Sequence, residues 1–299
     1  MEKMNYYNEN KNVNEEIPYD ERLKFYCGEL YEIDKIILNK KYIKTKDDLS
    51  DNEIYDIPFK KLLTKHNHLD KYFYYRFGDV EYELYIYSFT KNRFDSNKGL
   101  ILKCLEEDRH WGEVYKKYDK EEFKYKENKI FWRGTTTGRE HRLGNRFDLI
   151  KNWYDKHEYI DIGFSSICQD KDNYKKYVKG IIELEYFLKY KYILSVEGND
   201  KDSGLNWKLN SNSVVMMTKP RANSWLMEDK LIPNHHYILL KDDFSDLKEK
   251  YEWCENNQDK CEEIIKNAKG YMTQFFNVER EEKLQKNILD LYFSKVIPE

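Results

Sequence analysis

The sequence predicts an α/β protein that contains a parallel sheet with helices on both of its faces. In the second half of the chain, short apolar segments alternate with segments of helical spacing, which is the pattern of consecutive βαβ units. Of the 299 residues, 40% are hydrophobic, which is enough to bury sizeable cores. At ~150 residues per domain, this length favours about two domains.

The first half of the chain contains fewer clear elements. Residues 1–20 are rich in Asn, Glu and Lys and are expected to form a frayed tail. Apolar residues recur at helical spacing over 22–37 and predict a helix. The apolar, β-rich run 82–89 predicts a buried strand, and the turn at 78–79 before it places the carboxylate of Asp79 at the edge of that strand. The densely charged stretch 116–128 is the predicted linker.

The second half is predicted to alternate strictly. The strands are expected at 129–133, 159–163, 190–197, 213–218 and 236–240. The helices are expected at 145–156, 172–188, 203–211, 221–230, 244–254 and 257–269. Gly270 is expected to end the last of these helices, and 275–296 forms a final amphipathic segment.

Composition excludes several classes of protein. The net charge of −3 provides no electrostatic footprint for a dedicated nucleic-acid binder, so we expect no nucleic-acid partner. No apolar run approaches the ~18 residues of a membrane helix, and the polar start lacks the apolar stretch of a secretory signal. Five scattered cysteines without a Cys-x-x-Cys pair are expected to be reduced and structural. We therefore expect a cytoplasmic protein, with peripheral attachment to a membrane left open.

The most informative motif is Phe-Trp-Arg-Gly-Thr-Thr-Thr-Gly at 131–138, followed by Arg142 and Arg146. A strand ends at Arg133, a loop of small and hydroxyl residues follows, and a helix begins near Asn145. Doubly wound sheets cradle phosphate with this layout, because backbone N–H groups, hydroxyls and a helix N-terminus face the anion. Arginine adds bidentate binding of oxygens. The alternative interpretation is a polar loop with surface arginines.

Two further loops are predicted at the same edge of the sheet. Residues 192–205 form a strand followed by a Gly, Asn, Asp and Ser loop, and 213–228 repeat the pattern. Loops at the carboxyl ends of parallel strands bind ligands in open α/β sheets, so spacing alone predicts a nucleotide- or phosphate-binding protein. The Asp-x-Asp triplets at 170–172 and 200–202 could hold Mg²⁺ or Mn²⁺, but so acidic a sequence contains such triplets by chance.

With these motifs the chain resembles the family 90 glycosyltransferases, a capsule-associated and protein O-glucosyltransferase-like family with lipopolysaccharide-modifying bacterial members. The resemblance is strong over 129–270, moderate over 75–115 and absent over 1–70. Four ordered motifs carry it: 131–134 (FWRG); 191–194 (KYIL) with 197–199 (EGN); 211–215 (SNSVV); and 236–238 (HYI) followed by Asp242, Asp243 and Leu247.

The resemblance implies a GT-B fold, in which two Rossmann-like domains face a cleft. The acceptor-side domain would span 21–124, with 275–299 packing back on it, and the nucleotide-sugar domain would span 125–270. The implied reaction is an inverting transfer of a sugar, glucose or xylose, from a UDP-sugar to a hydroxyl of a glycan, a lipopolysaccharide-type or lipid-linked glycan, or a protein. Neither a cofactor nor a metal is expected.

The resemblance also assigns roles to residues. Asp79 matches the general base, and His110 beside Trp111 is the rival base. The residues implied in nucleotide-sugar binding are Arg133, Gly134, Thr135, Arg146, Gly198, Asn199, Ser203, Lys208, Trp225 and Glu228.

Three of these assignments leave alternatives open. Gly204 stands where the family has a diphosphate-binding arginine, and Lys208, one helical turn on, is the candidate substitute. Trp225 is either a wall of the base pocket or a core residue. Glu228 either accepts from ribose hydroxyls or is a solvated helix acid. The missing arginine also motivates a second hypothesis, a sugar-nucleotide-binding module that kept the fold and lost turnover.

Overall fold

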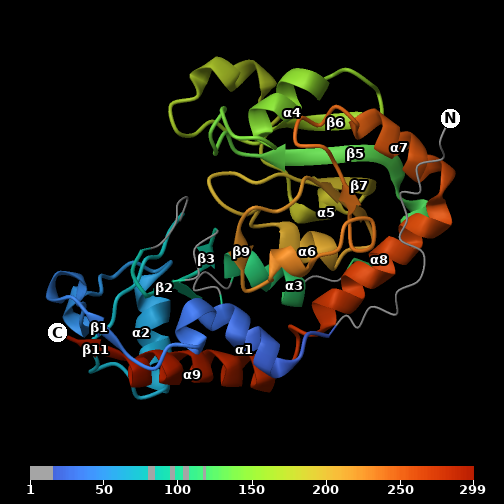
Figure 1. The fold of residues 1–299 in the computed structure, drawn as a ribbon. Coiled ribbons are helices and arrows are strands. Elements are labelled where there is room, and N and C mark those ends of the chain that lie inside the picture. The colour runs from blue at the N-terminus through green and yellow to red at the C-terminus, as the bar shows by residue number, and fades with distance from the viewer. Residues whose placement is uncertain (1–15, 80–84, 95–97, 104–107, 117–118) are drawn as a thin grey trace. The chain divides into compact units, whose positions relative to one another are not determined.

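The computed structural model describes residues 16–79, 85–94, 98–103, 108–116 and 119–299 (Figure 1). The described chain divides into two compact units. The first unit is formed by 113–221 and 229–273. The second is formed by 16–112, 222–228 and 274–299, so that three separate segments of the chain build it.

The first unit is built on a five-stranded parallel sheet with the strand order β10-β8-β7-β5-β6. This sheet confirms the predicted α/β class, and each predicted strand of the second half is present. Ile130 of β5 is aligned with Ile160 of β6 on one side and with Tyr192 of β7 on the other. The bounds are β5 Glu127–Gly134, β6 Ile160–Phe164, β7 Tyr190–Ser195, β8 Val214–Met217 and β10 Ile238–Leu239.

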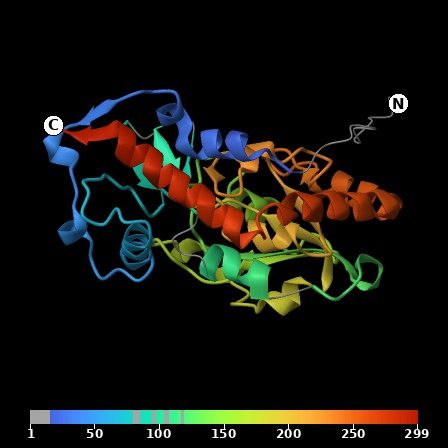
Figure 2. The same cartoon turned by 90° about the horizontal axis from the view of Figure 1, so that it is seen from below.

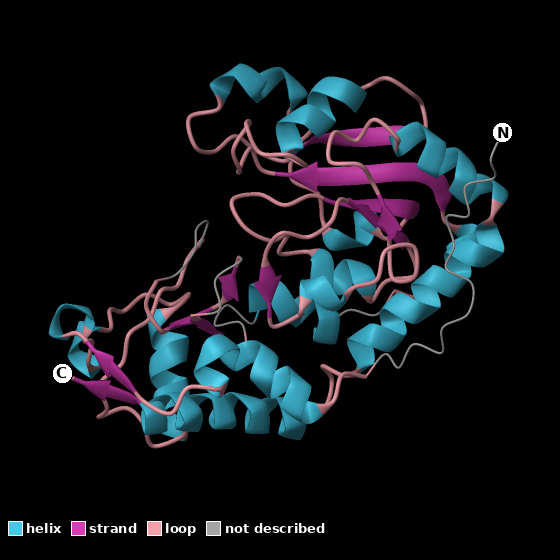
Figure 3. Cartoon of the chain, viewed as in Figure 1, coloured by secondary structure: helices cyan, strands magenta, loops and turns pink. Residues whose placement is uncertain are grey.

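Helices cover both faces of this sheet (Figures 1 and 3). Successive residues of a strand point to opposite faces, and Trp132 and Phe131 of β5 accordingly belong to separate core clusters. The larger cluster unites the Trp132 face with side chains of α4, α7 and α8, and the smaller one unites Phe131 with α5 and Trp207 of α6. The helices of the unit are α3 Glu113–Lys116, α4 Arg146–Trp153, α5 Leu184–Phe187, α6 Leu205–Leu209, α7 Leu247–Asn256 and α8 Gln258–Thr273.

The strand order contains one reversal. The chain passes from β5 to β6 at one edge and then crosses to β7 on the other side of β5, after which β8 and β10 follow outward. The reversal between β5 and β7 is a topological switch point, which is the position where open α/β sheets bind ligands. The loops after Gly134 and after Ser195 follow the two strands of this reversal.

Three helix predictions for the second half of the chain were wrong. The helix expected at 172–188 is a 3₁₀ helix at Asp172–Tyr177 and the short α5, separated by Gly180 with a φ of +92°. The helix expected at 221–230 is absent from these described residues, which form β9 (Asn223–Ser224) and a 3₁₀ turn at Glu228–Lys230. Gly270 does not end α8, which continues to Thr273.

The second unit combines helices with short strands (Figures 2 and 3). Its helices are α1 Tyr19–Cys27, α2 Asp56–Lys65 and α9 Val278–Lys295. Its strands are β1 Ile36–Leu38, β2 Ser88–Thr90, β3 Asn92–Arg93, β4 Gly99–Ile101, β9 Asn223–Ser224 and β11 Val296–Pro298. Helix α1 lies beside α9 in Figures 1 and 2, and the two helices are in contact. The helix expected over 22–37 ends early, because Gly28 has a φ of +57°.

Among the described residues of the second unit, the strands occur only as two-stranded pairs: β1 with β11, β2 with β4, and β3 with β9. A second Rossmann-like domain therefore stays a prediction. The expected strand at 82–89 falls partly outside the described residues, and its described end contributes to β2. Within the described ranges, no helix combines the length and the apolar character that crossing a membrane requires.

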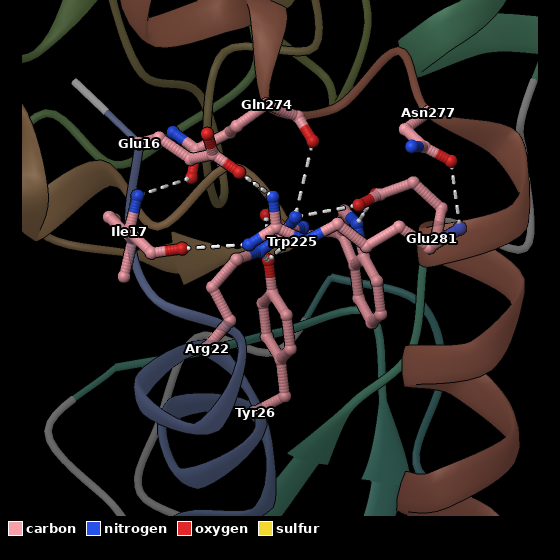
Figure 4. A network of polar contacts seen from close by, with 9 residues as sticks. Glu16, Ile17, Arg22, Tyr26, Trp225, Gln274, Asn277 and Glu281 are labelled. Carbon is pink, nitrogen blue, oxygen red and sulfur yellow. Dashed lines mark hydrogen bonds and ion pairs between the residues drawn. The ribbon is translucent and has the colours of Figure 1, made fainter.

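A buried polar network joins the three segments of the second unit (Figure 4). Arg22 of α1 donates to Glu281 of α9 at 2.7 Å and to the hydroxyl of Tyr26 at 2.9 Å. The Tyr26 hydroxyl donates to the carbonyl of Trp225 at 2.8 Å, and the two rings stack with centroids 4.0 Å apart. The Trp225 indole in turn donates to Glu281 at 2.5 Å. Segment 222–228 is therefore held by both terminal helices, which explains why it does not form the expected helix.

Candidate functional site

The loop after β5 leads directly into α4. Asn145 caps this helix, because its side chain accepts hydrogen bonds from the backbone N–H groups of Phe147 and Asp148, each at 2.8 Å. Two amides of the first turn thus already have an acceptor. An anion at this helix terminus would have to use other donors, and the side chain of Arg146, the first residue of α4, is the nearest by sequence.

Arg146 joins the two loops at the switch point. Its Nε and Nη2 donate to the carbonyl of Val196, after β7, at 3.2 and 3.1 Å. Its Nη1 donates to the carbonyl of Thr135 at 3.0 Å and to the hydroxyl of Thr137 at 2.7 Å, both after β5. The side chain is buried. Arg146 therefore lies at the end of the loop that the sequence predicted, and its side chain is buried inside this loop and not on its surface.

Close packing of two glycines brings the same loops together. Gly138 has a φ of +99°, and a Cβ there would lie 3.0 Å from the carbonyl oxygen of Gly198. A Cβ on Gly198 would lie 2.5 Å from the hydroxyl of Thr137. Neither position has room for a side chain. Asn199 completes the join, since its side-chain oxygen accepts from the N–H of Gly138 at 2.8 Å.

A third group of polar side chains lies beneath the loop after β7. Asp202 is buried and accepts from the hydroxyl of Ser195 at 2.7 Å and from the ammonium of Lys208. Lys208 also donates to the carbonyl of Leu194 at 3.1 Å. Lys208 is thus engaged with Asp202 at the base of the loop, while Ser203 and Gly204 are half-buried above it.

Burial and neighbouring charges together shift the pKa values of these groups. It lowers the pKa of Arg146 and of Lys208, and Asp202 offsets only part of the effect in each case. For Asp202, burial would raise the pKa, but the charge and hydrogen bond of Lys208 outweigh it, so that the pKa is lowered. The Asp202 carboxylate is consequently ionised at neutral pH and faces more than one buried cation.

Arg133 lies apart from this group. Its guanidinium pairs with Asp161 of β6 at 2.7 Å and stacks over the ring of Phe131, on the sheet face opposite Trp132. The carbonyl of Asp161 accepts a second hydrogen bond from it at 3.0 Å. Gly134 ends β5 and directly follows Arg133 in the chain. A Cβ on Gly134 would lie 3.3 Å from Nη1 of Arg146.

Trp225 and Glu228 belong to the second unit. Trp225 is fully buried in the network of Figure 4, which is the core alternative of the sequence analysis. Glu228 is only 1% exposed and accepts from the backbone N–H and the hydroxyl of Ser224, at 2.6 and 2.7 Å. The interpretation of Glu228 as a solvated helix acid was therefore wrong.

Asp79 and His110 also belong to the second unit. Asp79 follows Gly78, whose φ is +93°, and its Oδ1 lies 3.3 Å from the ammonium of Lys91. The Asp79 side chain is 42% exposed, which leaves part of the carboxylate accessible. His110 is buried within a turn of π-helix at Asp108–Gly112.

The described residues contain no cluster of three or more His, Cys, Asp or Glu side chains that could hold a metal ion. Of the two Asp-x-Asp triplets, Asp170 and Asp172 are exposed, whereas Asp200 and Asp202 are buried. The second triplet lies at the switch-point loop, where Lys208 supplies the positive charge next to Asp202.

The structure adds residues that the sequence analysis did not assign. Thr137 accepts from Arg146, Arg142 donates to the carbonyl of Asn199 at 2.8 Å, and Asp202 balances Lys208. Thr137 and Arg142 belong to the motif that starts at 131, and Asp202 belongs to the loop of 192–205. The roles depend on which loops face each other, and that information is not present in residue spacing.

Comparison with known proteins identifies relatives of this chain. The family model described as glycosyl transferase family 90 matches residues 102–296. The O-glucosyltransferase LpsA of Dichelobacter nodosus is 33% identical over 241 residues, which cover 80% of this chain and 72% of the relative. Protein O-glucosyltransferase 2 of Danio rerio is 27% identical over 184 residues, or 60% of this chain and 33% of the relative. The uncharacterized protein 179R of Invertebrate iridescent virus 6 is 35% identical over 92 residues, or 28% of this chain and 8% of the viral protein.

Proposed function

The chain belongs to glycosyl transferase family 90, and on this premise we propose that it transfers glucose or xylose from a UDP-sugar to an acceptor hydroxyl with inversion of the anomeric carbon. Two relatives bear the name O-glucosyltransferase, which favours glucose over xylose. The proposed acceptor is a glycan, a lipopolysaccharide-type glycan or a protein. The GT-B arrangement implied by the resemblance is part of the same proposal.

The switch point between β5 and β7 carries this proposal. In open parallel sheets, ligands bind at the carboxyl ends of the strands where the strand order reverses. The loops at this position contain Gly138 and Gly198 in close contact, hydroxyls at Thr135 and Thr137, and the buried guanidinium of Arg146. These groups supply the backbone approach, the hydroxyl donors and the positive charge that a diphosphate needs.

The charge balance of the loops supports an anionic ligand. Within the described residues, the hydrogen bonds of Arg146 end on carbonyl and hydroxyl oxygens, and Asp202 is hydrogen-bonded to Lys208. A buried cation without a directly bonded carboxylate is costly unless another negative charge approaches it. The diphosphate of a nucleotide sugar would supply that charge, and its departure as UDP would be stabilised by the same groups.

Proton transfer is assigned to Asp79. An inverting transfer needs one carboxylate that takes the proton of the acceptor hydroxyl while the oxygen attacks the anomeric carbon. The Asp79 carboxylate is partly exposed and can be reached by an acceptor, whereas His110 is 3% exposed. This difference favours Asp79 over the rival base.

Metal independence is proposed for the same reason. The leaving diphosphate would be stabilised by Arg146, hydroxyls and backbone N–H groups, so no divalent cation is needed for that task. Chelation of metals should therefore leave the transfer rate unchanged. Strict dependence on Mn²⁺, abolished by Asp200→Ala, would contradict this part of the proposal.

The alternative function is a nucleotide-sugar-binding module with impaired catalysis. One observation favours it: Lys208, the candidate replacement for the arginine missing at Gly204, is 3% exposed and bonded to Asp202 and Leu194. An ammonium held in this way is poorly placed to contact a diphosphate. The two functions predict different behaviour of the same purified protein.

The decisive experiment measures sugar transfer and donor hydrolysis over a panel of nucleotide sugars, together with UDP affinity by calorimetry. The enzyme should turn over UDP-glucose or UDP-xylose and bind UDP. Asp79→Asn should lower kcat by ~10²–10⁴ with UDP affinity unchanged, and Asp70→Asn, an exposed aspartate of the same unit, is the control. UDP binding without turnover of any donor would favour the impaired module, and the absence of UDP binding would refute both functions.

A further inference from the structure

We propose that Lys91 is a positioning residue for Asp79, whose buried ammonium orients the carboxylate and keeps it ionised for proton transfer. This inference rests on the proposed function, in which Asp79 is the general base. It adds a residue from the bend between β2 and β3 to the catalytic assembly of the second unit.

Backbone pairing brings together the two segments that carry these residues. The N–H of Phe89 in β2 donates to the carbonyl of Tyr74 at 3.0 Å, and the N–H of Arg76 donates back to the carbonyl of Phe89 at 2.8 Å. The two segments run parallel at this point. Parallel extended chains rise equally per residue, so the chain reaches Asp79 on one segment and Lys91 on the other within a few residues of this pairing.

Burial distinguishes the two side chains of the pair. The side chain of Lys91 is 3% exposed, whereas that of Asp79 is 42% exposed, and Nζ lies 3.3 Å from Oδ1. An ammonium removed from water requires compensating partners, and the Asp79 carboxylate is one of them. One carboxylate oxygen is thereby held against Lys91 while the group as a whole stays accessible to an acceptor.

Aromatic packing fixes the surroundings of the pair. The ring of Tyr55 lies 5.8 Å from the Lys91 ammonium and stacks against Phe77, with centroids 6.1 Å apart and an interplanar angle of 14°. Phe77 is followed by Gly78, whose φ of +93° turns the chain into Asp79. The segment that carries the base is therefore anchored immediately before the base itself.

The chemistry assigns different tasks to the two groups. The acceptor O–H bond breaks as its proton passes to Asp79, the acceptor oxygen forms a bond to the anomeric carbon, and the bond to the diphosphate oxygen breaks with its electron pair leaving on UDP. Lys91 remains protonated throughout and takes no part in the transfer. Its charge disfavours a protonated Asp79 before the acceptor arrives, and its hydrogen bond restricts the carboxylate to one orientation.

A double-mutant cycle tests the role of Lys91. The variants are Lys91→Met, Lys91→Arg, Asp79→Asn and the double variant Asp79→Asn with Lys91→Met, each assayed for kcat, KM and UDP affinity. Lys91→Met should lower kcat by ~10–100-fold, which is less than the loss of the base itself, and leave UDP affinity unchanged. Lys91→Arg should restore most of kcat. In the Asp79→Asn background, Lys91→Met should cause no further loss.

A matched control separates this role from general stabilisation. Lys46 pairs with Asp70 at 2.7 Å in the same unit, but both side chains are exposed, so Lys46→Met should leave kcat unchanged. If Lys91→Met retains full kcat, or lowers kcat equally in the Asp79→Asn background, the proposal is overturned while Asp79 can still be the base. If Asp79→Asn itself retains full transfer, Asp79 is not the base, and the role proposed for Lys91 is then wrong as well. Should Lys91→Met not fold, Lys91→Gln against Lys91→Arg gives the same comparison.

Discussion

Arg22 in the second compact unit and Arg146 in the first are both buried, but they differ in what neutralises their charge. Arg22 in the second unit forms a direct ion pair with the buried Glu281 at 2.7 Å. Arg146 in the first unit is hydrogen-bonded, among the described residues, to the carbonyls of Val196 and Thr135 and to the hydroxyl of Thr137.

The pKa shifts of the two arginines follow this difference. Burial alone would lower the pKa of Arg22, but Tyr26 and Glu281 outweigh it and raise the pKa above its usual value. For Arg146, burial lowers the pKa, and Asp202 and the other nearby acids offset only part of the effect. Arg22 and Glu281 form a buried ion pair that joins α1 to α9. Arg146 is a buried cation whose hydrogen bonds end on carbonyl and hydroxyl oxygens, and we propose that a diphosphate binds next to it.

The largest expected effect tests the ion pair of Arg22 and Glu281. Glu281→Gln keeps the shape of the side chain but removes the only charge directly bonded to Arg22 within the described residues. Breaking a buried ion pair costs about 3–5 kcal/mol, so the free energy of unfolding measured in urea should fall by that amount. UDP affinity of the folded protein should not change. Glu282→Gln removes an exposed partner of Lys65 and should cost below ~1 kcal/mol. Equal losses in the free energy of unfolding for the two variants would show that Arg22 and Glu281 do not form a tight ion pair.

The next prediction tests the role of the buried guanidinium of Arg146. Arg146→Ala removes the proposed charge-assisted contact to the diphosphate, which would be worth about 1.5–3 kcal/mol, so UDP affinity measured by calorimetry should fall about tenfold to a hundredfold. Turnover should fall as well, because the leaving diphosphate loses the same contact. Lys151→Ala, on the exposed side of the same helix, is the control and should bind UDP normally. Unchanged UDP binding by the Arg146→Ala variant would contradict the proposal that the diphosphate binds at the switch point.

The pH dependence of the free energy of unfolding tests the charge of Asp202 in the first unit. The pKa of Asp202 is lowered in the fold, so its charge stabilises the folded state above the unfolded-state pKa of ~3.9. That stabilisation is lost as the pH falls through the folded-state value. Asp202→Asn keeps one acceptor oxygen and should cost about 1–3 kcal/mol at pH 6, and the difference from the wild type should shrink at pH 3. Asp172→Asn, at the same position of the exposed triplet, should show no such trend. A constant difference for Asp202→Asn would argue against an ionised carboxylate.

The smallest effect concerns the position where the family arginine is missing. The φ of Gly204 is −85°, which suits any residue, and a Cβ there would lie 3.0 Å from Nε1 of Trp207 and 3.2 Å from Cε of Lys208. Gly204→Arg should therefore be accommodated by small side-chain shifts and should tighten UDP binding by at most about tenfold, or ~1.4 kcal/mol. Gly204→Ala introduces the same crowding without the charge and should not tighten binding. Equal affinities of the two variants would show that an arginine here does not reach the diphosphate.

Much of the first unit follows from the sequence alone. Apolar runs such as that of β7 can only be satisfied by burial on both faces, which is the property of a central parallel strand. The loops after these strands are equally evident, because Gly, Thr, Asn and Asp interrupt the apolar pattern. The family resemblance, which the comparisons confirm, came from the same segments.

Helix predictions failed where tertiary contacts override local preference. Segment 221–230 has helical spacing, but β9 pairs with β3, and Trp225 is held by Tyr26 and Glu281, which lie about 200 and 56 residues away. A periodic pattern records which side chains are buried and not what buries them. Contacts of this sequence separation leave no local signal.

The sequence by itself determined the α/β class, the strands of the sheet, the polar loops that follow them and the family. The tertiary structure decided the strand order, and with it the fact that the loops after β5 and β7 meet at a switch point. It also decided that Arg146 and Lys208 are buried, that Arg133 pairs with Asp161 on the other face, and that Lys91 lies against Asp79. The physical reason is that residue types and periodicity specify local conformation and burial, whereas the partner of a buried charge depends on which distant segments are packed beside it.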